Sequence, residues 1–469
     1  MTTTATAPAP FWTLDRVASA LASGGDGAAF PRGDRPLRAV TTDTRAIGAG
    51  DLFVALKGER FDAHDFLAEA VRKGAAALVV SRVPAVGSLD VPVYVVPDTL
   101  VALGQLARYW RRAWGRIVVG VAGSNGKTTT KDILRAALGS VLDVHATQGN
   151  LNNRVGVPLT LLGMPPHVEL AVIEIGTNIP GEVGILRAIA EPDVAVITSV
   201  AEEHLEGLGD LEGVMREESA IADGTPVVIT PAAQPEIAEA VRGRARRVVS
   251  AGLEAGDLRA DRYGTGEDGR GWIEMGGVTV RLPLLGPHNL RNAMLALAAA
   301  RELGVPLERA AAGIEAMPQP KMRLASEALG RATVINDAYN ANPGSTRAAV
   351  ELLAATGRGR QRVAVLGTMR ELGAHADRLH EEIARQALAS DVEVVAGIGD
   401  FAPALERAGA GDARVVTASD VDELWPRLRE RLTPDAVILL KASRGVALER
   451  ILPHLQQWAG LEPRPTEAH

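Results

Sequence analysis

Residues 117–138, IVVGVAGSNGKTTTKDILRAAL, decide the fold class and point to the first function to consider. The apolar run 117–121 is typical of a buried parallel strand, and 131–138 has the apolar spacing of a helix. Between them, glycines let backbone N–H groups curl around a phosphate, and the helix N-terminus adds partial positive charge. Lys127 can reach the terminal phosphates, and the Thr128 hydroxyl is placed for Mg²⁺. The segment therefore predicts a site for a nucleoside triphosphate, most simply ATP.

This loop departs from the strict phosphate-loop pattern at one position. Val121 stands where the first glycine of G-x-x-x-x-G-K-[ST] is expected. A plain glycine-rich turn between a strand and a helix is the alternative, and the Gly-Lys-Thr-Thr sequence in this context argues against it. The predicted phosphate-binding residues are Gly123, Ser124, Asn125, Gly126, Lys127, Thr128 and Thr129.

Composition restricts the class of protein. A chain of 469 residues predicts about three domains, and 46% hydrophobic residues with only 3% aromatics suit α/β layers packed with aliphatic side chains. The net charge of −7 does not provide the excess of positive charge that is typical of nucleic-acid-binding proteins. The chain has no cysteine, so disulfides, thiolate metal sites and thiol catalysis are excluded.

The N-terminal sequence and the hydropathy suggest a location. Residues 1–10 lack the basic segment and apolar core of a signal peptide, and we expect them to be disordered. No apolar stretch reaches the roughly 20 residues that a membrane span needs. We therefore expect a cytoplasmic protein with no membrane span, and a monomer.

Alternating strand and helix patterns predict an α/β fold of three domains, with boundaries at 1–100, 101–318 and 319–469 and a hinge at Pro318–Pro320. We expect a small N-terminal α/β domain, a central parallel-sheet domain that carries the phosphate loop, and a C-terminal Rossmann-like domain. Residues 248–280 are richer in glycine and charge and predict an antiparallel edge. The expected strands are 39–42, 51–56, 76–80, 93–96, 117–121, 170–175, 194–199, 226–230, 333–336, 363–366, 392–398, 414–417 and 436–440.

Two polar residues follow predicted strands of the central sheet. Glu174 ends the strand that begins at Leu170, and His204 comes shortly after the strand 194–199. Ligands of open α/β sheets collect at the carboxyl ends of strands, so both side chains are candidates for metal or phosphate contact beside Thr128. A solvated glutamate and a structural histidine are the alternatives.

Four further loops are dense in polar side chains. They are 148–153 (QGNLNN), 286–292 (GPHNLRN), 336–343 (NDAYNANP) and 441–445 (KASRG). Amides can bind a polar substrate or a purine edge, and cations can bind a carboxylate or phosphate. Turn and helix-cap chemistry, with Asn289 as a helix cap, explains the same residues; function is favoured for 336–343, and the other three loops are left undecided.

Together these motifs resemble the Mur ligase family of ATP-dependent amide ligases, from about Phe11 to Leu452. The family resemblance rests on 123–129, 174–176, 204–206, and His288 and Asn289 with Asn292. Within the family, QGNLNNRVGVP (148–158), DAYNANP (337–343) with Ser345, and KASRG resemble the member that adds D-alanyl-D-alanine to UDP-N-acetylmuramoyl-tripeptide. Residues 42–45 and 51–58 are similar to that member's UDP-binding domain.

The resemblance implies roles for matching residues. ATP is held by the phosphate loop together with Asn289, Asn292, Arg323 and Asp337, and Mg²⁺ by Thr128, Glu174 and His204. Lys127, Glu174, His204 and Glu218 form the implied catalytic set. The UDP substrate is assigned to Thr42, Asp43, Thr44, Arg45, Lys57, Asn150, Asn152 and Asn153. The dipeptide is assigned to Asn340, Asn342, Lys441, Ser443 and Arg444.

Two positions depart from the family pattern. A lysine that becomes carbamylated is usual at Glu218, and an aspartate is usual at Thr368. Glu218, or less probably its neighbour Glu217, can supply the carboxylate that carbamylation provides elsewhere. The alternative is that Glu218 is a solvated residue on a helix surface.

Three other functions fit parts of the pattern. A sibling ligase that adds a single amino acid is disfavoured because Asn340–Pro343 replaces the Asp-Asn-Pro-Arg motif typical of such an enzyme. A folylpolyglutamate synthetase is disfavoured by the resemblance to a UDP-binding domain. A non-catalytic nucleotide-binding homologue is disfavoured because Lys127, Thr128, Glu174 and His204 are all present.

Overall fold

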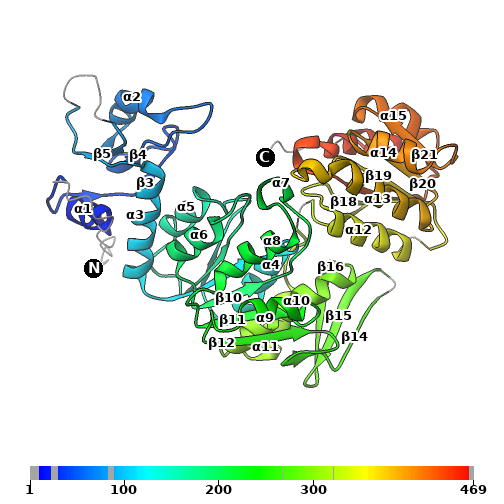
Figure 1. The fold of residues 1–469 in the computed structure, drawn as a ribbon, viewed down its shortest axis with the longest axis horizontal. Coiled ribbons are helices and arrows are strands. Elements are labelled where there is room, and N and C mark those ends of the chain that lie inside the picture. The colour runs from blue at the N-terminus through cyan, green and yellow to red at the C-terminus, as the bar shows by residue number, and fades with distance from the viewer. Residues whose placement is uncertain are drawn as a thin grey trace, which may run out of the picture. The chain divides into compact units, whose positions relative to one another are not determined.

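The structure is a computed structural model that describes residues 10–22, 30–82, 89–266, 268–320, 322–356 and 358–463 (Figure 1). The disorder expected for residues 1–10 falls almost wholly outside these ranges. Two compact units make up the described chain. The first draws on Met1–Gly120, Asp143–Gly176 and Glu182–Asp193, and the second on Val121–Leu142, Thr177–Gly181 and Val194–His469.

The N-terminal part of the first unit contains a small parallel sheet. Its four strands lie in the order β3 (Val40–Thr41), β4 (Asp51–Val54), β5 (Ala75–Val80) and β6 (Val93–Val95). Its core contains the fully buried Phe53, Leu78 and Val80. The other elements here are β1 (Trp12–Thr13), α1 (Leu14–Ala22), β2 (Pro36–Leu37), α2 (Leu67–Arg72) and α3 (Thr99–Trp114).

The largest sheet has seven strands in the order β13-β12-β11-β10-β7-β9-β8. The order reverses at β7, because its two neighbours β9 and β10 follow one another in the sequence. Ligands of doubly wound sheets bind at such a reversal, beyond the carboxyl ends of the strands. The bounds are β7 (Ile117–Ala122), β8 (Val144–Ala146), β9 (Leu170–Glu174), β10 (Val194–Ile197), β11 (Val227–Pro231), β12 (Arg247–Gly252) and β13 (Leu258–Arg259).

Two helices of the second unit pack against the helix that follows the phosphate loop. They are α10 (Pro287–Glu302) and α11 (Leu307–Glu315), and both contact α4 (Lys127–Leu138). Because Ala293–Ala300 of α10 is buried all round, this helix forms an interior layer. The remaining helices before the hinge are α5 (Gly156–Leu162), α6 (Glu182–Ala190), α7 (Leu205–Leu208), α8 (Leu211–Glu218) and α9 (Pro235–Ala240).

The prediction of an antiparallel edge at 248–280 is wrong for its first half. Strands β12 and β13 pair in parallel and extend the main sheet. Only β14 (Arg262–Thr265), β15 (Arg270–Met275) and β16 (Val278–Leu285) form an antiparallel sheet. Glycine and charge mark the turns in both parts of this segment, so composition could not separate them.

A six-stranded sheet follows residue 320, where the sequence predicts a hinge, in the order β17-β18-β22-β19-β20-β21. Only the edge strand β17 runs antiparallel, and its signal was missed because half of its residues face solvent. The strands are β17 (Ala325–Leu329), β18 (Ala332–Asp337), β19 (Arg362–Leu366), β20 (Val394–Ile398), β21 (Val415–Ala418) and β22 (Val437–Lys441). The helices are α12 (Pro343–Thr356), α13 (Ala376–Ala389), α14 (Phe401–Ala408), α15 (Val421–Arg429) and α16 (Leu452–Trp458).

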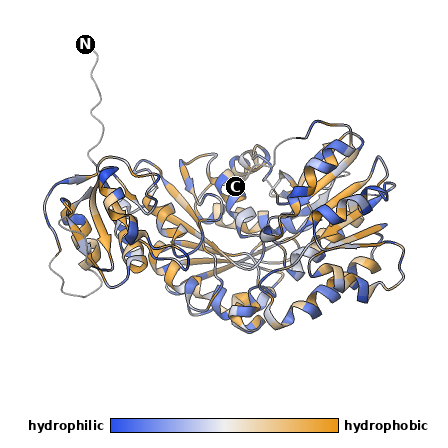
Figure 2. Ribbon diagram, turned by 90° about the horizontal axis from the view of Figure 1, so that it is seen from above, coloured by the Kyte–Doolittle hydropathy of each residue, from blue (hydrophilic) through white to orange (hydrophobic). Residues whose placement is uncertain are grey.

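Apolar strands supply the core of this sheet. Fully buried residues such as Val363, Ile438 and Leu440 pack beneath the helices, and the strands are largely orange in Figure 2. Burying each such side chain contributes about 1.5–3 kcal/mol. The predicted α/β class is therefore confirmed. Among the described residues, no helix is long and apolar enough to cross a membrane.

Candidate active site

The loop after β7 has the geometry of a phosphate-binding turn. Gly123 and Gly126 adopt positive φ angles of 119° and 85°, and α4 begins at Lys127. A side chain at Gly123 would place its Cβ 2.4 Å from Thr198 Oγ1, so only glycine fits there. Ser199, two residues beyond the end of β10, holds the loop: Ser124 N donates to Ser199 O at 2.8 Å, and Asn125 N to Ser199 Oγ at 3.0 Å. The loop is therefore held in this shape by hydrogen bonds within the protein.

Lys127 lies over this loop. Its Nζ donates to the carbonyl oxygens of Gly123 and, at 3.1 Å, of Ser124. Nζ also lies 3.5 Å from Oε1 of Glu203, whose side chain is 4% exposed. Thr128, in the first turn of α4, is half-buried. The ammonium group thus lies where phosphate oxygens would meet the helix N-terminus.

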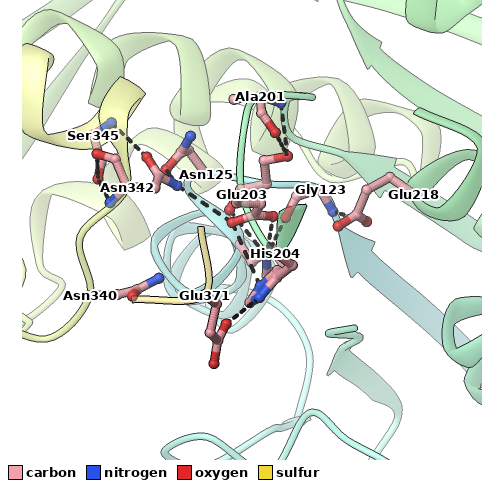
Figure 3. Close-up of polar contacts among 12 residues, drawn as sticks. Gly123, Asn125, Ala201, Glu203, His204, Glu218, Asn340, Asn342, Ser345 and Glu371 are labelled. Atoms are coloured by element: carbon pink, nitrogen blue, oxygen red, sulfur yellow. Dashed lines mark hydrogen bonds and ion pairs between the residues drawn. The ribbon is translucent and has the colours of Figure 1, made fainter. Parts of the chain in front are cut away.

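Glu203 is a site residue that the sequence analysis missed. Besides Lys127, it meets His204 Nε2 at 3.9 Å and Asn342 Nδ2 at 3.5 Å through Oε2. Figure 3 shows it between these side chains. The only available signal was its position, directly before His204 and after a buried strand.

His204 adopts a left-handed backbone conformation, with φ of 50°, just before α7. Its Nδ1 forms an ion pair with Oε2 of Glu371, which comes from the loop after β19. Burial would lower the pKa of His204, but the Glu371 hydrogen bond and the charge of Glu203 outweigh it and raise that pKa above its usual value. His204 is thus linked to Lys127 of the phosphate loop through Glu203, and its contact with a metal or phosphate stays a prediction.

Glu218, the last residue of α8, is completely buried. Its Oε2 accepts a hydrogen bond from Gly123 N at 2.6 Å, so it contacts the phosphate loop directly (Figure 3). Burial raises the pKa of Glu218 to about 7. The alternative of a solvated helix-surface residue is thus wrong. Glu217 accepts instead from Thr177 Oγ1 at 3.2 Å and Gly181 N at 2.7 Å.

Glu174 lies at the end of β9, in the first unit, and is 2% exposed. Its Oε1 accepts from Asn152 Nδ2 at 2.9 Å, and its backbone N donates to Thr147 Oγ1 at 2.9 Å. Among the described residues, its Oε2 has no hydrogen-bonding partner. The alternative of a solvated strand-end glutamate is therefore wrong.

The amide-rich loop 148–153 contains residues that fit turn chemistry and residues that fit substrate binding. Asn153 Oδ1 accepts from Val155 N and Gly156 N, which is turn chemistry at the start of α5. Asn152 contacts Glu174, whereas Asn150 is exposed. The substrate role of these three asparagines stays a prediction.

The two asparagines assigned to the nucleotide base are buried in the first turns of α10. Asn292 Nδ2 donates to Asn289 Oδ1 at 3.0 Å, and Asn289 Nδ2 donates to Leu285 O at 2.8 Å. Gly286, and not Asn289, is the residue that precedes the helix as its cap. The helix-cap alternative for Asn289 is thus wrong. A Cβ at Gly126 would lie 2.5 Å from Asn292 Oδ1, so this pair adjoins the phosphate loop.

Lys441 of β22 is 2% exposed and is fully engaged within the C-terminal sheet. Its Nζ lies 2.7 Å from Asp337 Oδ2 and donates to Asn340 O at 2.6 Å. Ser443 Oγ accepts from Arg370 N at 3.0 Å. These contacts hold the loop after β18 in place, so the geometry favours a positioning role for Lys441 over direct contact with a dipeptide.

Two predicted arginines of this part lie against an aromatic ring that the sequence analysis did not single out. The guanidinium carbons of Arg323 and Arg444 lie 4.2 Å and 5.4 Å from the ring centre of Tyr339. Asn340 and Arg444 are exposed, as a substrate-binding side chain requires. Cation–π contact holds both arginines against one ring, although their charges repel each other.

Asn342, predicted for the dipeptide, contacts the phosphate loop instead. Its Nδ2 donates to Asn125 Oδ1 at 2.8 Å, and its Oδ1 accepts from Ser345 N at 2.8 Å (Figure 3). With 3% exposure it is available to a ligand only at the junction of these two loops.

The residues predicted for the UDP substrate lie in the first unit. Arg45 binds Asp43 through both its backbone N and its guanidinium, and the side-chain hydrogen bond from Arg45 lowers the pKa of Asp43 to about 2. The backbone of Lys57 pairs with that of Asp62 in an isolated antiparallel β-bridge. The Arg45 side chain is 87% exposed, so its guanidinium is accessible to an anion. Thr42 and Thr44 complete the same turn.

No preformed metal centre is seen in the described ranges: no three His, Asp or Glu side chains are placed together to hold an ion. Two buried carboxylate oxygens nevertheless lack a hydrogen-bonding partner among the described residues, Glu174 Oε2 and Glu218 Oε1, whereas Glu203 Oε1 meets Lys127 Nζ at 3.5 Å. Partnerless buried carboxylate oxygens are costly, and hard cations are their natural partners.

Comparison with known proteins places this geometry in a family. The chain matches the Mur ligase family catalytic domain over residues 36–111, the Mur ligase middle domain over 121–300, and the Mur ligase glutamate ligase domain over 322–444. The UDP-N-acetylmuramoyl-tripeptide–D-alanyl-D-alanine ligase of Bacillus subtilis is 36% identical over 427 residues, which cover 89% of this chain and 93% of that protein.

Solved structures give the same result. A crystal structure of MurF from Acinetobacter baumannii matches with a TM-score of 0.86 and 32% identity, covering 95% of this chain and 99% of that one. The MurF ligase of Thermotoga maritima in complex with ADP matches with a TM-score of 0.82 and 29% identity, covering 92% and 99%. The predicted three-domain α/β architecture is confirmed by these matches, whereas the boundaries at 100 and 318 stay predictions. Phosphate loop, buried carboxylates and whole-length similarity together show that this chain belongs to the Mur ligase family.

Proposed function

We propose that this chain is an ATP-dependent ligase that joins D-alanyl-D-alanine to UDP-N-acetylmuramoyl-tripeptide in cytoplasmic peptidoglycan precursor synthesis. One observation carries the proposal: the preformed phosphate loop with Lys127 at its mouth lies in a chain similar over nearly its whole length to ligases of this name. The ADP complex of the Thermotoga maritima relative supports ATP as the nucleotide.

The chemistry follows from the weak electrophilicity of a carboxylate. A carboxylate oxygen of the tripeptide attacks the γ-phosphorus of ATP, the bond to ADP breaks, and an acyl phosphate forms. The dipeptide amine then attacks the acyl carbon, loses a proton, and expels phosphate from a tetrahedral intermediate. Lys127 and the N–H groups of the loop would offset the charge that collects when two anions meet.

Mg²⁺ belongs to the proposal, because the residues present fit it. Mg²⁺ prefers hard oxygen ligands and keeps several of its waters, so it needs only one or two carboxylates and the phosphates of its nucleotide. Thr128, Glu174 and His204 would hold it, with the buried carboxylate of Glu218 taking the part of a carbamylated lysine. The ion would supply neutralisation of phosphate charge.

The three substrates would be bound by separate sets of residues. Thr42–Arg45 and Lys57 would bind the UDP substrate, helped by Asn150, Asn152 and Asn153. Asn340, Ser443 and Arg444 would receive the dipeptide, with Lys441 and Asn342 holding the loop that presents them. Asn289, Asn292, Arg323 and Asp337 would contact the nucleotide.

A phosphate-release assay tests this function against the alternatives. With UDP-N-acetylmuramoyl-tripeptide and ATP, phosphate release should require D-alanyl-D-alanine and should not be supported by single amino acids. Release with a single amino acid and a shorter UDP-linked peptide would indicate a sibling ligase. Nucleotide binding with no release under any combination would indicate a non-catalytic homologue.

A further inference from the structure

Two strained residues face each other beside the phosphate loop. His204 and Glu371 are both non-glycine residues with left-handed backbone, at φ of 50° and 65°. Such a conformation is strained and persists only where the surroundings impose it, most often at functional sites. Because both members of one ion pair have this backbone conformation, the contact between them is a candidate for a functional role.

Two contacts join Glu371 to the segment of His204. Glu371 Oε2 forms an ion pair with His204 Nδ1 (Figure 3). In addition, Glu371 O accepts from Glu206 N at 3.3 Å. The opposite ring nitrogen, Nε2, lies 3.9 Å from the carboxylate of Glu203, which in turn meets Lys127. Glu371 therefore sets which edge of the imidazole faces the phosphate side.

The turn that carries Glu371 is itself held in place. Met369 N donates to Nε2 of the buried His380 at 2.9 Å, and His380 Nδ1 pairs with Ala376 O at 2.7 Å. Arg370 N donates to Ser443 Oγ at 3.0 Å. Side chains that act through a neighbour are effective only when their own position is locked in this way.

We propose that Glu371 is a positioning residue for the ligase reaction: it orients His204 from the C-terminal sheet so that Nε2 is presented to the nucleotide phosphates. The inference rests on the proposed function for its substrates, but the ion pair stands on the geometry alone. It makes the orientation of His204 conditional on the turn 367–373 lying against the phosphate loop.

A double-mutant cycle tests it. Glu371→Ala should lower kcat about 10- to 100-fold, the usual cost of losing such a supporting carboxylate, with little change in KM for the UDP substrate. In a His204→Ala background, Glu371→Ala should cost nothing further, because a residue that acts only through His204 has nothing left to orient. Glu371→Gln keeps an acceptor oxygen and should retain most of the activity.

Glu202 supplies the matched control. It pairs with Arg378 at 3.8 Å and so joins the same two parts of the chain, but both side chains are about half exposed. Glu202→Ala should stay within two-fold of the parent, as expected for a surface ion pair. Equal losses of kcat for Glu202→Ala and Glu371→Ala would show that any contact between these two parts of the chain matters equally, and would overturn the proposal. Additive losses of kcat for His204→Ala and Glu371→Ala would overturn it as well.

The same cycle run on ATP binding by calorimetry separates this inference from the proposed function. Calorimetry needs neither the tripeptide nor the dipeptide. Non-additive losses of ATP affinity in a chain without ligase turnover would refute the function and keep the positioning role. Ligase turnover in the parent with additive losses in both measurements would refute the positioning role alone.

Discussion

The side-chain amide of Asn342 donates a 2.8 Å hydrogen bond to the side-chain oxygen of Asn125, so the loop after β18 touches the phosphate loop directly. The two residues are 217 positions apart in the sequence. A group carried by this loop of the C-terminal sheet would therefore arrive beside the phosphate loop. This is the arrangement that an acyl phosphate and an incoming amine require.

Lys127→Ala should abolish ligation and leave the fold intact. The ammonium lies at the mouth of the phosphate loop, where it would neutralise the β- and γ-phosphates, and its loss should lower kcat by at least about 10²-fold. Steady-state phosphate release measures the loss, and thermal unfolding checks the fold. Lys73→Ala, at a half-exposed helix end, is the control. Turnover within a few-fold of the parent would refute the role of Lys127.

Glu218→Gln should raise the Mg²⁺ concentration needed for half-maximal activity. The buried carboxylate beside Gly123 would lose the charge that a cation needs, while the amide keeps its size. Activity of the parent should not depend on bicarbonate, because a glutamate needs no carbamylation. Glu212→Gln on the same helix, where the side chain is 81% exposed, is the control. Equal activity of Glu218→Gln and parent at limiting Mg²⁺ would contradict the proposal.

Arg444→Ala and Asn340→Ala should raise KM for the dipeptide several-fold more than KM for ATP or the UDP substrate. Both side chains are exposed, and Arg444 lies near the Tyr339 ring, in the part of the chain assigned to the incoming amine. Initial rates with each substrate varied in turn give the three KM values. A similar rise in all three would mean that the variants have lost structure and not selectivity.

Unfolding of the parent should become easier as the pH falls below about 6.5, and His380 should account for part of this slope. Burial lowers the pKa of His380 in the folded protein, so the unfolded chain takes up a proton that the folded chain resists. Stability is therefore retained above the unfolded pKa and declines as the pH falls toward the folded one. Thermal unfolding at pH 5.5 and 7.5 measures the slope. His380→Gln should reduce it, and an unchanged slope would contradict this assignment.

Local sequence was sufficient for the elements whose signals are continuous along the chain. The apolar run 117–121 became β7, the polar turn after it became the phosphate loop, and the strands 194–197 and 437–441 were found within a few residues. Helix α10 begins at Pro287, earlier than its apolar run indicated, because buried polar Asn289 and Asn292 hide the pattern in its first turns.

Contacts between distant residues could not be predicted in this way. Glu203 meets Asn342 across 139 positions, and no local pattern indicates that pairing. Glu371 looks like an ordinary loop residue until the fold brings it to His204. Burial was the other hidden quantity: Glu218 was equally consistent with a helix surface, and only packing against Gly123 decides its environment.

Gly126 and Asn292 are packed too closely to admit an added side chain between them. Because a single added carbon at Gly126 would come within 2.5 Å of the Asn292 amide, the loop that would hold the phosphates and the helix that would read the base have no freedom to slide past each other. A bound nucleotide would therefore meet a phosphate loop and an asparagine pair whose separation is fixed by close packing. One methyl group at position 126 would force the phosphate loop and the start of α10 apart and so change that separation.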